Sequence, residues 1–124
     1  MGDLDRQERH EMKKPLTFDE YQKKVRKTAF YPNIGTSLFY PALGLAEEAG
    51  EVCGKIKKII RDDGGIMSEE KKQAIIKELG DIIWYVAAQC WELKIPMSQA
   101  AQSNIDKITD REKRGTKRGS GDNR

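Results

Sequence analysis

The chain has 124 residues, enough for one compact domain and too few for two. Charged side chains make up 35% of the sequence and hydrophobic ones 37%, and 23 basic residues face 20 acidic ones, for a net charge of +3. This near balance argues against a dedicated nucleic-acid-binding protein, and no apolar run approaches the ~20 residues that a membrane span needs.

Residues 1–14 carry few apolar groups, and we expect them to form a disordered N-terminal arm that contains the single histidine, His10. The arm lacks the hydrophobic stretch of a secretory signal. The two cysteines, Cys53 and Cys90, lie inside apolar patterns. We therefore predict that both are reduced core residues of a cytoplasmic protein.

Residues 15–114 are predicted to form one helical domain. Thr17 opens a capping-box pattern, and apolar residues then recur at a spacing of three to four. The expected helices are one of three turns from Phe18, one over about residues 41–61, one from the Ser68 cap to about Leu93, and one over about 98–114. Because no segment alternates with the period of a strand, we predict an all-α fold with a four-helix arrangement and antiparallel neighbours. Residues 115–124 hold three glycines and no apolar side chain, and we expect a flexible, basic tail.

The second and third predicted helices carry carboxylates among residues that a core should bury. Glu48 and Glu51 are three residues apart, as are Glu78 and Asp81, so each pair points to one side of its helix. If the helices pack antiparallel at ~8–10 Å, the pairs can meet. Four converging carboxylates repel one another unless cations neutralise them. An all-carboxylate set, with no histidine in the expected helices, favours Mg²⁺ or Mn²⁺ and phosphoryl chemistry over redox chemistry.

Acidic pairs on a solvated helix face are also common, so either pair alone is weak evidence. A glycine accompanies each pair, Gly50 beside Glu51 and Gly80 beside Asp81. Glycine costs a helix about 1 kcal/mol relative to alanine. Its presence in both motifs suggests a close backbone approach or room for a bound group, which favours the metal site over a solvated face.

The fourth predicted helix carries candidate phosphate-binding groups. Asn104, Lys107 and Arg111 share one face, and Arg114 follows three residues later. Amide, ammonium and guanidinium groups donate to phosphate oxygens without competing for a metal. An ordinary basic helix end, favoured by the helix dipole, explains these residues equally well.

Two further residues lie near the carboxylate motifs. Lys55 follows Glu51 by one turn, and it either reaches a phosphate or remains a surface lysine. Trp84 follows Asp81 by three residues, so its ring lies near the same face, where it either stacks on a base or packs against the protein.

Together these motifs resemble a known signature. They are Glu47-Glu48-x-x-Glu51, then 26 intervening residues, then Glu78-x-x-Asp81, followed by Asn104-x-x-Lys107 with Arg111 and Arg114. The pattern and its context resemble the MazG-like family of all-α nucleotide pyrophosphohydrolases. The glycine-rich tail is similar to that of short, often phage-encoded members.

The resemblance implies Mg²⁺-dependent hydrolysis of a nucleoside triphosphate at the α–β bond, giving a monophosphate and pyrophosphate. Mn²⁺ can substitute, and two or more ions per site are expected. The resemblance also implies a homodimer or dimer of dimers, with the bundle completed between subunits. It implies a lean towards purine deoxynucleotides (dGTP, dATP). If the chain is phage-encoded, it would act in the host cytoplasm.

The resemblance also assigns roles to the matching residues. The metal ligands would be Glu48, Glu51, Glu78 and Asp81, and the catalytic carboxylates Glu47, Glu48 and Glu51. Glu47 would bind a further metal or orient the attacking water, and the choice of base between Glu47 and Glu51 stays open. The substrate-binding set would be Lys55, Trp84, Asn104, Lys107, Arg111 and Arg114.

Two other functions remain in view at this point. One is a non-catalytic helical module that senses a nucleotide or binds a partner, in which the carboxylates hold a ligand without turnover. The other, weaker one is nucleic-acid binding by the basic tail, residues 115–124.

Overall fold

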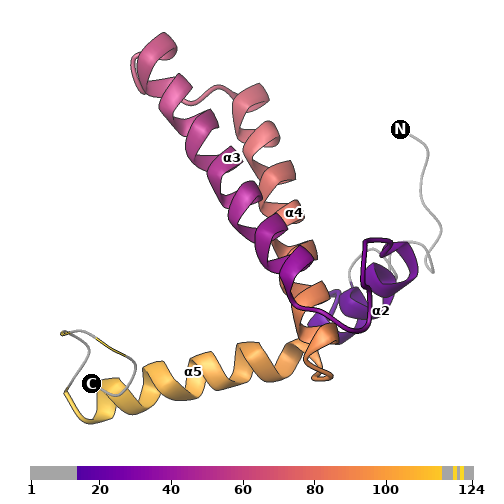
Figure 1. The fold of residues 1–124 in the computed structure, drawn as a ribbon. Coiled ribbons are helices and arrows are strands. Elements are labelled where there is room, and N and C mark those ends of the chain that lie inside the picture. The colour runs from indigo at the N-terminus through magenta and orange to yellow at the C-terminus, as the bar shows by residue number, and fades with distance from the viewer. Residues whose placement is uncertain (1–13, 116–118, 120, 122–124) are drawn as a thin grey trace, which may run out of the picture.

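The computed structural model describes residues 14–115, 119 and 121. Within them the chain forms α2 (Phe18–Thr28), α3 (Phe39–Asp63), α4 (Glu69–Glu92) and α5 (Met97–Lys113), and no strand. The all-α, four-helix prediction is confirmed. Figure 1 shows α3 and α4 as a long antiparallel hairpin, with α2 near the end opposite the hairpin turn and α5 leading away from it. The predicted arm, apart from Lys14, and most of the predicted tail lie outside the described residues.

Helix α2 begins at the predicted residue and has the predicted length of about three turns. The Thr17 hydroxyl accepts a hydrogen bond of 3.1 Å from the Glu20 amide, which confirms the N-cap. The helix stops at Thr28 after 11 residues, and Ala29 is extended. The loop of residues 29–38 follows, and α3 begins two residues earlier than expected, because a proline in the first helical turn leaves no hydrogen bond unmade.

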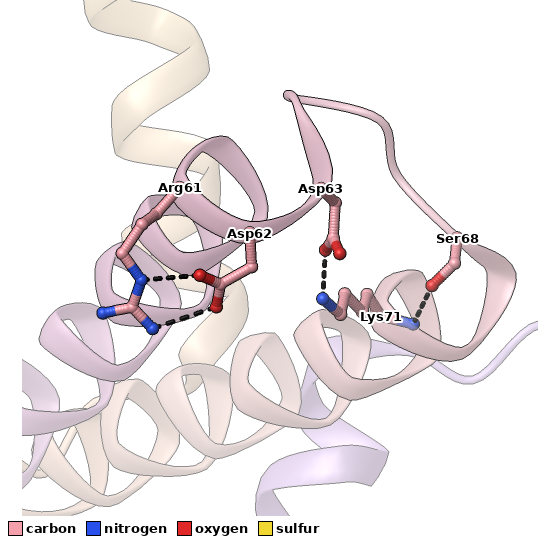
Figure 2. Close-up of polar contacts among 5 residues, drawn as sticks. All are labelled: Arg61, Asp62, Asp63, Ser68 and Lys71. Carbon is pink, nitrogen blue, oxygen red and sulfur yellow. Dashed lines mark hydrogen bonds and ion pairs between the residues drawn. The ribbon is translucent and has the colours of Figure 1, made fainter.

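The turn between α3 and α4 fixes the antiparallel hairpin. Gly64 and Gly65 take φ angles of +60° and +80°, which L residues rarely adopt. The Ser68 hydroxyl then caps α4 by accepting a hydrogen bond of 3.2 Å from the Lys71 amide. Figure 2 shows the Lys71 ammonium group paired with Asp63 across the turn. Two capped helix ends joined by so short a connection must pack side by side.

The buried core lies where α2, the second half of α4 and the start of α5 meet. Its members are Val25, Ala87, Cys90 and Met97, with Tyr21, Trp84, Val86 and Ile95 packed against them. Polar contacts reinforce this junction, because Asp19 of α2 accepts hydrogen bonds from the amide and hydroxyl of Ser98 at 3.0 and 2.7 Å. Helix α5 is therefore anchored by its N-terminal end.

Much of the apolar surface is not buried within one chain. Eight large side chains on three helices each expose at least 41% of their area: Leu43, Ile56, Ile60, Ile76, Leu79, Ile83, Ile105 and Ile108. Of the helices, only α4 covers α3. The prediction that Cys53 is a core residue is accordingly wrong for a single chain, since Cys53 is exposed, whereas Cys90 is buried as predicted.

Helix α5 does not close a bundle with the hairpin. It contacts α2 and α4 and makes no contact with α3. Figure 1 shows it meeting the other helices near its N-terminal end and extending away from the α3–α4 hairpin. In the described part of the chain, no helix combines the length and apolar character required to cross a membrane.

Candidate metal centre

Three carboxylates from facing helices converge halfway along the hairpin. One carboxylate oxygen each from Glu48 of α3 and from Glu78 and Asp81 of α4 lie within 4.8 Å of one another. Glu78 and Asp81 share a face of α4 because they are three residues apart, and the antiparallel packing brings Glu48 opposite them. The predicted meeting of the two motifs is thus visible for these three residues.

The electrostatics of the cluster are those of crowded like charges. The pKa of Glu48 is raised to about 6, first by burial, then by a hydrogen bond with Glu78 and by the negative charges of Asp81, Glu78 and Glu47. A carboxyl group whose pKa lies this far above its ordinary value has too little positive charge beside it to favour its ionised form. Three oxygen donors at this spacing are a chemically suitable cradle for a hard divalent cation.

Lys55 supplies part of the missing counter-charge. Its Nζ atom lies 3.3 Å from Oε1 of Glu78, so an ion pair crosses from α3 to α4 beside the cluster. The sequence offered a choice between a phosphate contact and a surface lysine. The structure instead shows this half-buried side chain paired with a carboxylate of the cluster.

The other two carboxylates of the first motif are more distant from the cluster. Glu47 and Glu51 are both exposed, and neither belongs to the group whose oxygens lie within 4.8 Å. Glu47 nevertheless contributes to the raised pKa of Glu48. Within one chain, Gly50 and Gly80 face open space, because a Cβ atom on either would meet nothing within 4 Å. They therefore do not serve a close backbone approach inside this chain.

A small hollow of about 260 Å³ opens beside the cluster, lined by Glu48, Asp81, Trp84 and Tyr85. The Trp84 ring stands edge-on to Tyr85, with ring centroids 5.1 Å apart. Its Nε1 donates a hydrogen bond of 3.1 Å to the Thr28 hydroxyl. Trp84 is therefore both a packing residue held by α2 and a wall of the hollow.

Sequence reasoning missed the aromatic contribution of the loop before α3. Tyr31 stacks on Tyr40 with centroids 5.3 Å apart, and it meets Trp84 edge-on at 6.4 Å. The Tyr31 hydroxyl donates a hydrogen bond of 2.6 Å to Glu92 of α4, and burial together with that bond raises the tyrosine pKa. Nearby, burial and the charge of Asp81 raise the pKa of Tyr21. The aromatic composition of the loop was the available signal, but a contact spanning 61 residues has no local pattern.

The candidate phosphate-binding residues lie on α5, apart from the cluster. Lys107 is half-buried, Asn104 and Arg114 are exposed, and Arg111 is buried. The Arg111 guanidinium donates to the Gly121 carbonyl oxygen at 3.3 Å, and Arg114 pairs with Asp110 at 2.7 Å. Because α5 makes no contact with α3, a single chain does not bring this face to Glu48.

Comparisons with known proteins match more than half of the chain to a family. Residues 41–116, which span nearly all of α3 and the whole of α4 and α5, match the MazG nucleotide pyrophosphohydrolase domain. The chain belongs to the MazG family. It is also 41% identical to the Gene 37 protein of Mycobacterium phage L5 over 111 residues, which cover 86% of this chain and 97% of that protein. No solved structure gives a significant match.

Some residues around the cluster lie inside the matched range and others precede it. The MazG domain contains the carboxylate cluster, the α5 cations and Trp84. Helix α2 and the loop with Tyr31 lie before it, and so does Tyr40 at the start of α3. The MazG domain thus contains the acidic centre, while Tyr31 and Tyr40, which precede the match, contact its Trp84 side.

Proposed function

We propose that the chain hydrolyses nucleoside triphosphates between the α and β phosphates, with Mg²⁺ bound at the carboxylate cluster. Water attacks the α phosphorus, and the bond from that phosphorus to the bridging oxygen breaks. The products are pyrophosphate, which is the leaving group, and a nucleoside monophosphate. The observation that carries the proposal is the convergence of Glu48, Glu78 and Asp81 oxygens within 4.8 Å on facing helices. The MazG domain match supports the reaction class.

The donor set suits Mg²⁺, with Mn²⁺ as a substitute, since both prefer oxygen ligands. Glu48, Glu78 and Asp81 would hold the first ion, and Glu51, one turn from Glu48, would complete the set. When bound, the ions, two or more per site, neutralise the triphosphate and activate the attacking water. Glu47 or Glu51 would accept the proton of that water, since both flank Glu48 on α3 without belonging to the three-oxygen group.

The base and sugar of the substrate would bind in the hollow beside the cluster. Trp84 and Tyr85 give it aromatic walls, and rings of this kind stack on nucleobases. We propose purine deoxynucleotides, dGTP and dATP, as preferred substrates, because the sequence resembles short members of the family that prefer them. The phage relative supports action in the host cytoplasm.

We further propose that the working form is a homodimer or a dimer of dimers. The exposed apolar side chains on α3, α4 and α5 would be buried against a second copy at about 25 cal/mol per Å². Helix α5 does not reach the cluster of its own chain, so Asn104, Lys107, Arg111 and Arg114 would serve the cluster of the second copy. Each active site would then combine carboxylates of one subunit with phosphate-binding groups of the other.

The decisive experiment resolves the products of eight ribo- and deoxynucleoside triphosphates incubated with Mg²⁺ or Mn²⁺. We expect monophosphate and pyrophosphate in equal amounts and no orthophosphate. Glu48→Gln and Asp81→Asn should each abolish turnover, by at least about a hundredfold, with the helical content kept. Glu70→Gln, on the exposed first turn of α4, is the matched control and should retain full activity.

Two results would contradict the proposal. Full activity in both cluster variants would remove the site assignment. Thermal stabilisation by a nucleotide with Mg²⁺, without any product from the eight substrates, would instead identify a nucleotide-sensing module.

A further inference from the structure

A larger groove lies away from the carboxylate hollow and shares no residue with it. It has a volume of about 720 Å³, which is within the range of small-molecule sites. Its walls are helix α2, Gly35 of the following loop, the last residues of α4 and the connection from α4 to α5. The lining residues are Gln22, Lys23, Arg26, Lys27, Gly35, Trp91, Glu92, Lys94, Ile95 and Pro96.

The groove is cationic. Lys23, Arg26, Lys27 and Lys94 line it, against a single carboxylate. That carboxylate, Glu92, already accepts hydrogen bonds from the Tyr31 hydroxyl at 2.6 Å and the Gly35 amide at 2.9 Å on one oxygen. Among the described residues, no ion pair within 4 Å joins any of the four cations to an acidic group. An anionic ligand would balance this charge.

The walls of the groove are already in place. The Gln22 amide donates to the Ile95 carbonyl and accepts from the Met97 amide, both at 3.0 Å, which ties α2 to the α4–α5 connection. The Arg26 guanidinium lies 4.1 Å from the centroid of the Trp91 ring. An indole and a guanidinium plane are the surfaces on which nucleobases stack. The groove therefore offers an indole–guanidinium pair framed by three lysines.

Lys94 occupies a backbone position that the same chain elsewhere gives to glycine. Its φ is +60°, and the hydrogen bonds that close α4 run from the Lys94 amide to the Trp91 carbonyl and from the Ile95 amide to the Cys90 carbonyl. This is a Schellman ending, in which glycine is usual. The ends of α3 and α5 place Gly64 and Gly115 at φ of +60° and +69°. A lysine at the corresponding site lowers stability relative to glycine, and the Lys94 side chain lines the groove.

We propose that this groove is a second, non-catalytic site for a nucleoside monophosphate. Its base would stack on the outer side of the Arg26–Trp91 pair, and its phosphate would bind Lys94 with Lys23 and Lys27. The inference goes beyond the proposed function and does not depend on it, since the groove contains none of the cluster carboxylates. A ligand there would also touch Gly35 and Glu92, the two residues that hold the Tyr31 loop beside the cluster.

The test measures dGMP binding to the full chain by calorimetry in EDTA, so that no divalent ion contributes. We expect saturable binding, and a loss of affinity of about tenfold in Lys94→Gly, because one charge-assisted contact is removed. The same variant should melt at a higher temperature than the wild type, because glycine relieves the left-handed backbone. Lys24→Ala removes a lysine of α2 outside the groove and should change neither quantity.

Hydrogen exchange locates the ligand. Added dGMP should slow exchange of the amides of residues 33–36 and 91–95 and leave residues 48–51 and 78–81 unchanged. Unaltered affinity in Lys94→Gly, or an equal loss in Lys24→Ala, would overturn the proposal. So would equally tight binding of inorganic phosphate, which lacks the ring, or affinity that grows with the length of an added oligodeoxynucleotide, which would indicate a single-stranded nucleic-acid site.

The two proposals fail separately. Binding in EDTA that survives Glu48→Gln but falls in Lys94→Gly supports the groove whether or not the chain turns over a triphosphate. Binding that requires Mg²⁺ and is lost in Glu48→Gln would assign the nucleotide to the carboxylate cluster and overturn the second site.

Discussion

The backbone of Gly44 lies directly against the ring of Tyr85, so that a Cβ atom at position 44 would be 2.3 Å from the ring's Cε1 and Cζ atoms. Carbon atoms that are not bonded to each other do not approach so closely. Gly44 belongs to α3 and Tyr85 to α4, and Tyr85 lines the hollow beside Glu48. The contact therefore sets both the separation of the two helices and the position of a ring at the candidate active site.

Gly44→Ala should therefore destabilise the protein. The methyl group must displace the Tyr85 ring or separate the helices, and overpacking of this kind typically costs about 1–3 kcal/mol. Chemical denaturation measures the loss, and turnover of a triphosphate should fall with it because Tyr85 moves. Gly54→Ala is the control on the same helix, since a Cβ atom there meets nothing within 4 Å. It should stabilise the helix by up to about 1 kcal/mol, and a Gly44→Ala variant of unchanged stability would contradict the contact.

Local patterns predicted the helices because each helix carries its own signals. The Thr17 and Ser68 caps and the apolar spacing are properties of neighbouring residues, and they gave helix starts within two residues of those observed. The facing of Glu48 with Glu78 and Asp81 followed from three-residue spacing and antiparallel packing. These features needed no knowledge of distant contacts.

The remaining features depend on contacts between distant parts of the chain. The bond from Tyr31 to Glu92 joins residues 61 positions apart, and it organises a loop that has no periodicity of its own. Apolar spacing predicted burial for Cys53, yet spacing cannot tell whether a second helix covers the whole stripe. The direction of α5 likewise depends on a distant contact, because its N-terminal end is anchored through Ser98 to Asp19 of α2. The helix makes no contact with α3.

Asp19 should make the docking of α5 dependent on pH. Hydrogen bonds from the Ser98 amide and hydroxyl lower the pKa of Asp19 below its ordinary 3.8. The folded state therefore favours the ionised carboxylate, and this contribution to stability is present above pH 3.8 and lost as the pH falls through the lowered pKa. Asp19→Asn should melt at a lower temperature than the wild type at pH 7, and the difference should shrink below about pH 4.

Thermal melts from pH 2.5 to 7 test this expectation. Asp106→Asn is a suitable control, because Asp106 is exposed on α5 and bonds only locally, to Gln102 at 2.9 Å. Its melting temperature should follow that of the wild type throughout. A constant difference between Asp19→Asn and wild type over the whole range would exclude ionisation as the source of the effect.

Lys55→Gln should have opposite effects on the metal-free and metal-bound protein. Lys55 pairs with Glu78 at 3.3 Å, so its removal leaves the carboxylate cluster without that counter-charge and should lower the melting temperature in EDTA. The same change removes a cation that repels a divalent ion, and Mg²⁺ should bind about threefold more tightly. Lys57→Gln, an exposed neighbour on α3, should alter neither value.

Melting temperatures recorded across an Mg²⁺ titration separate the two effects. The curve for Lys55→Gln should start below that of the wild type and reach half of its rise at a lower Mg²⁺ concentration. Weaker Mg²⁺ binding in this variant would mean that Lys55 orders Glu78 for the metal rather than competing with it.

Mixing two inactive variants should restore activity if the active site is shared between subunits. Glu48→Gln removes a carboxylate of the cluster, and Lys107→Ala removes a cation of α5, which does not contact α3 in its own chain. In a mixed dimer, the intact cluster of one chain meets the intact α5 of the other, so one of the two sites is complete. Statistical exchange makes half of the dimers mixed, which predicts about a quarter of wild-type activity. If α5 instead folded back onto its own hairpin, each chain would carry a defective site, and the mixture would remain as inactive as its components.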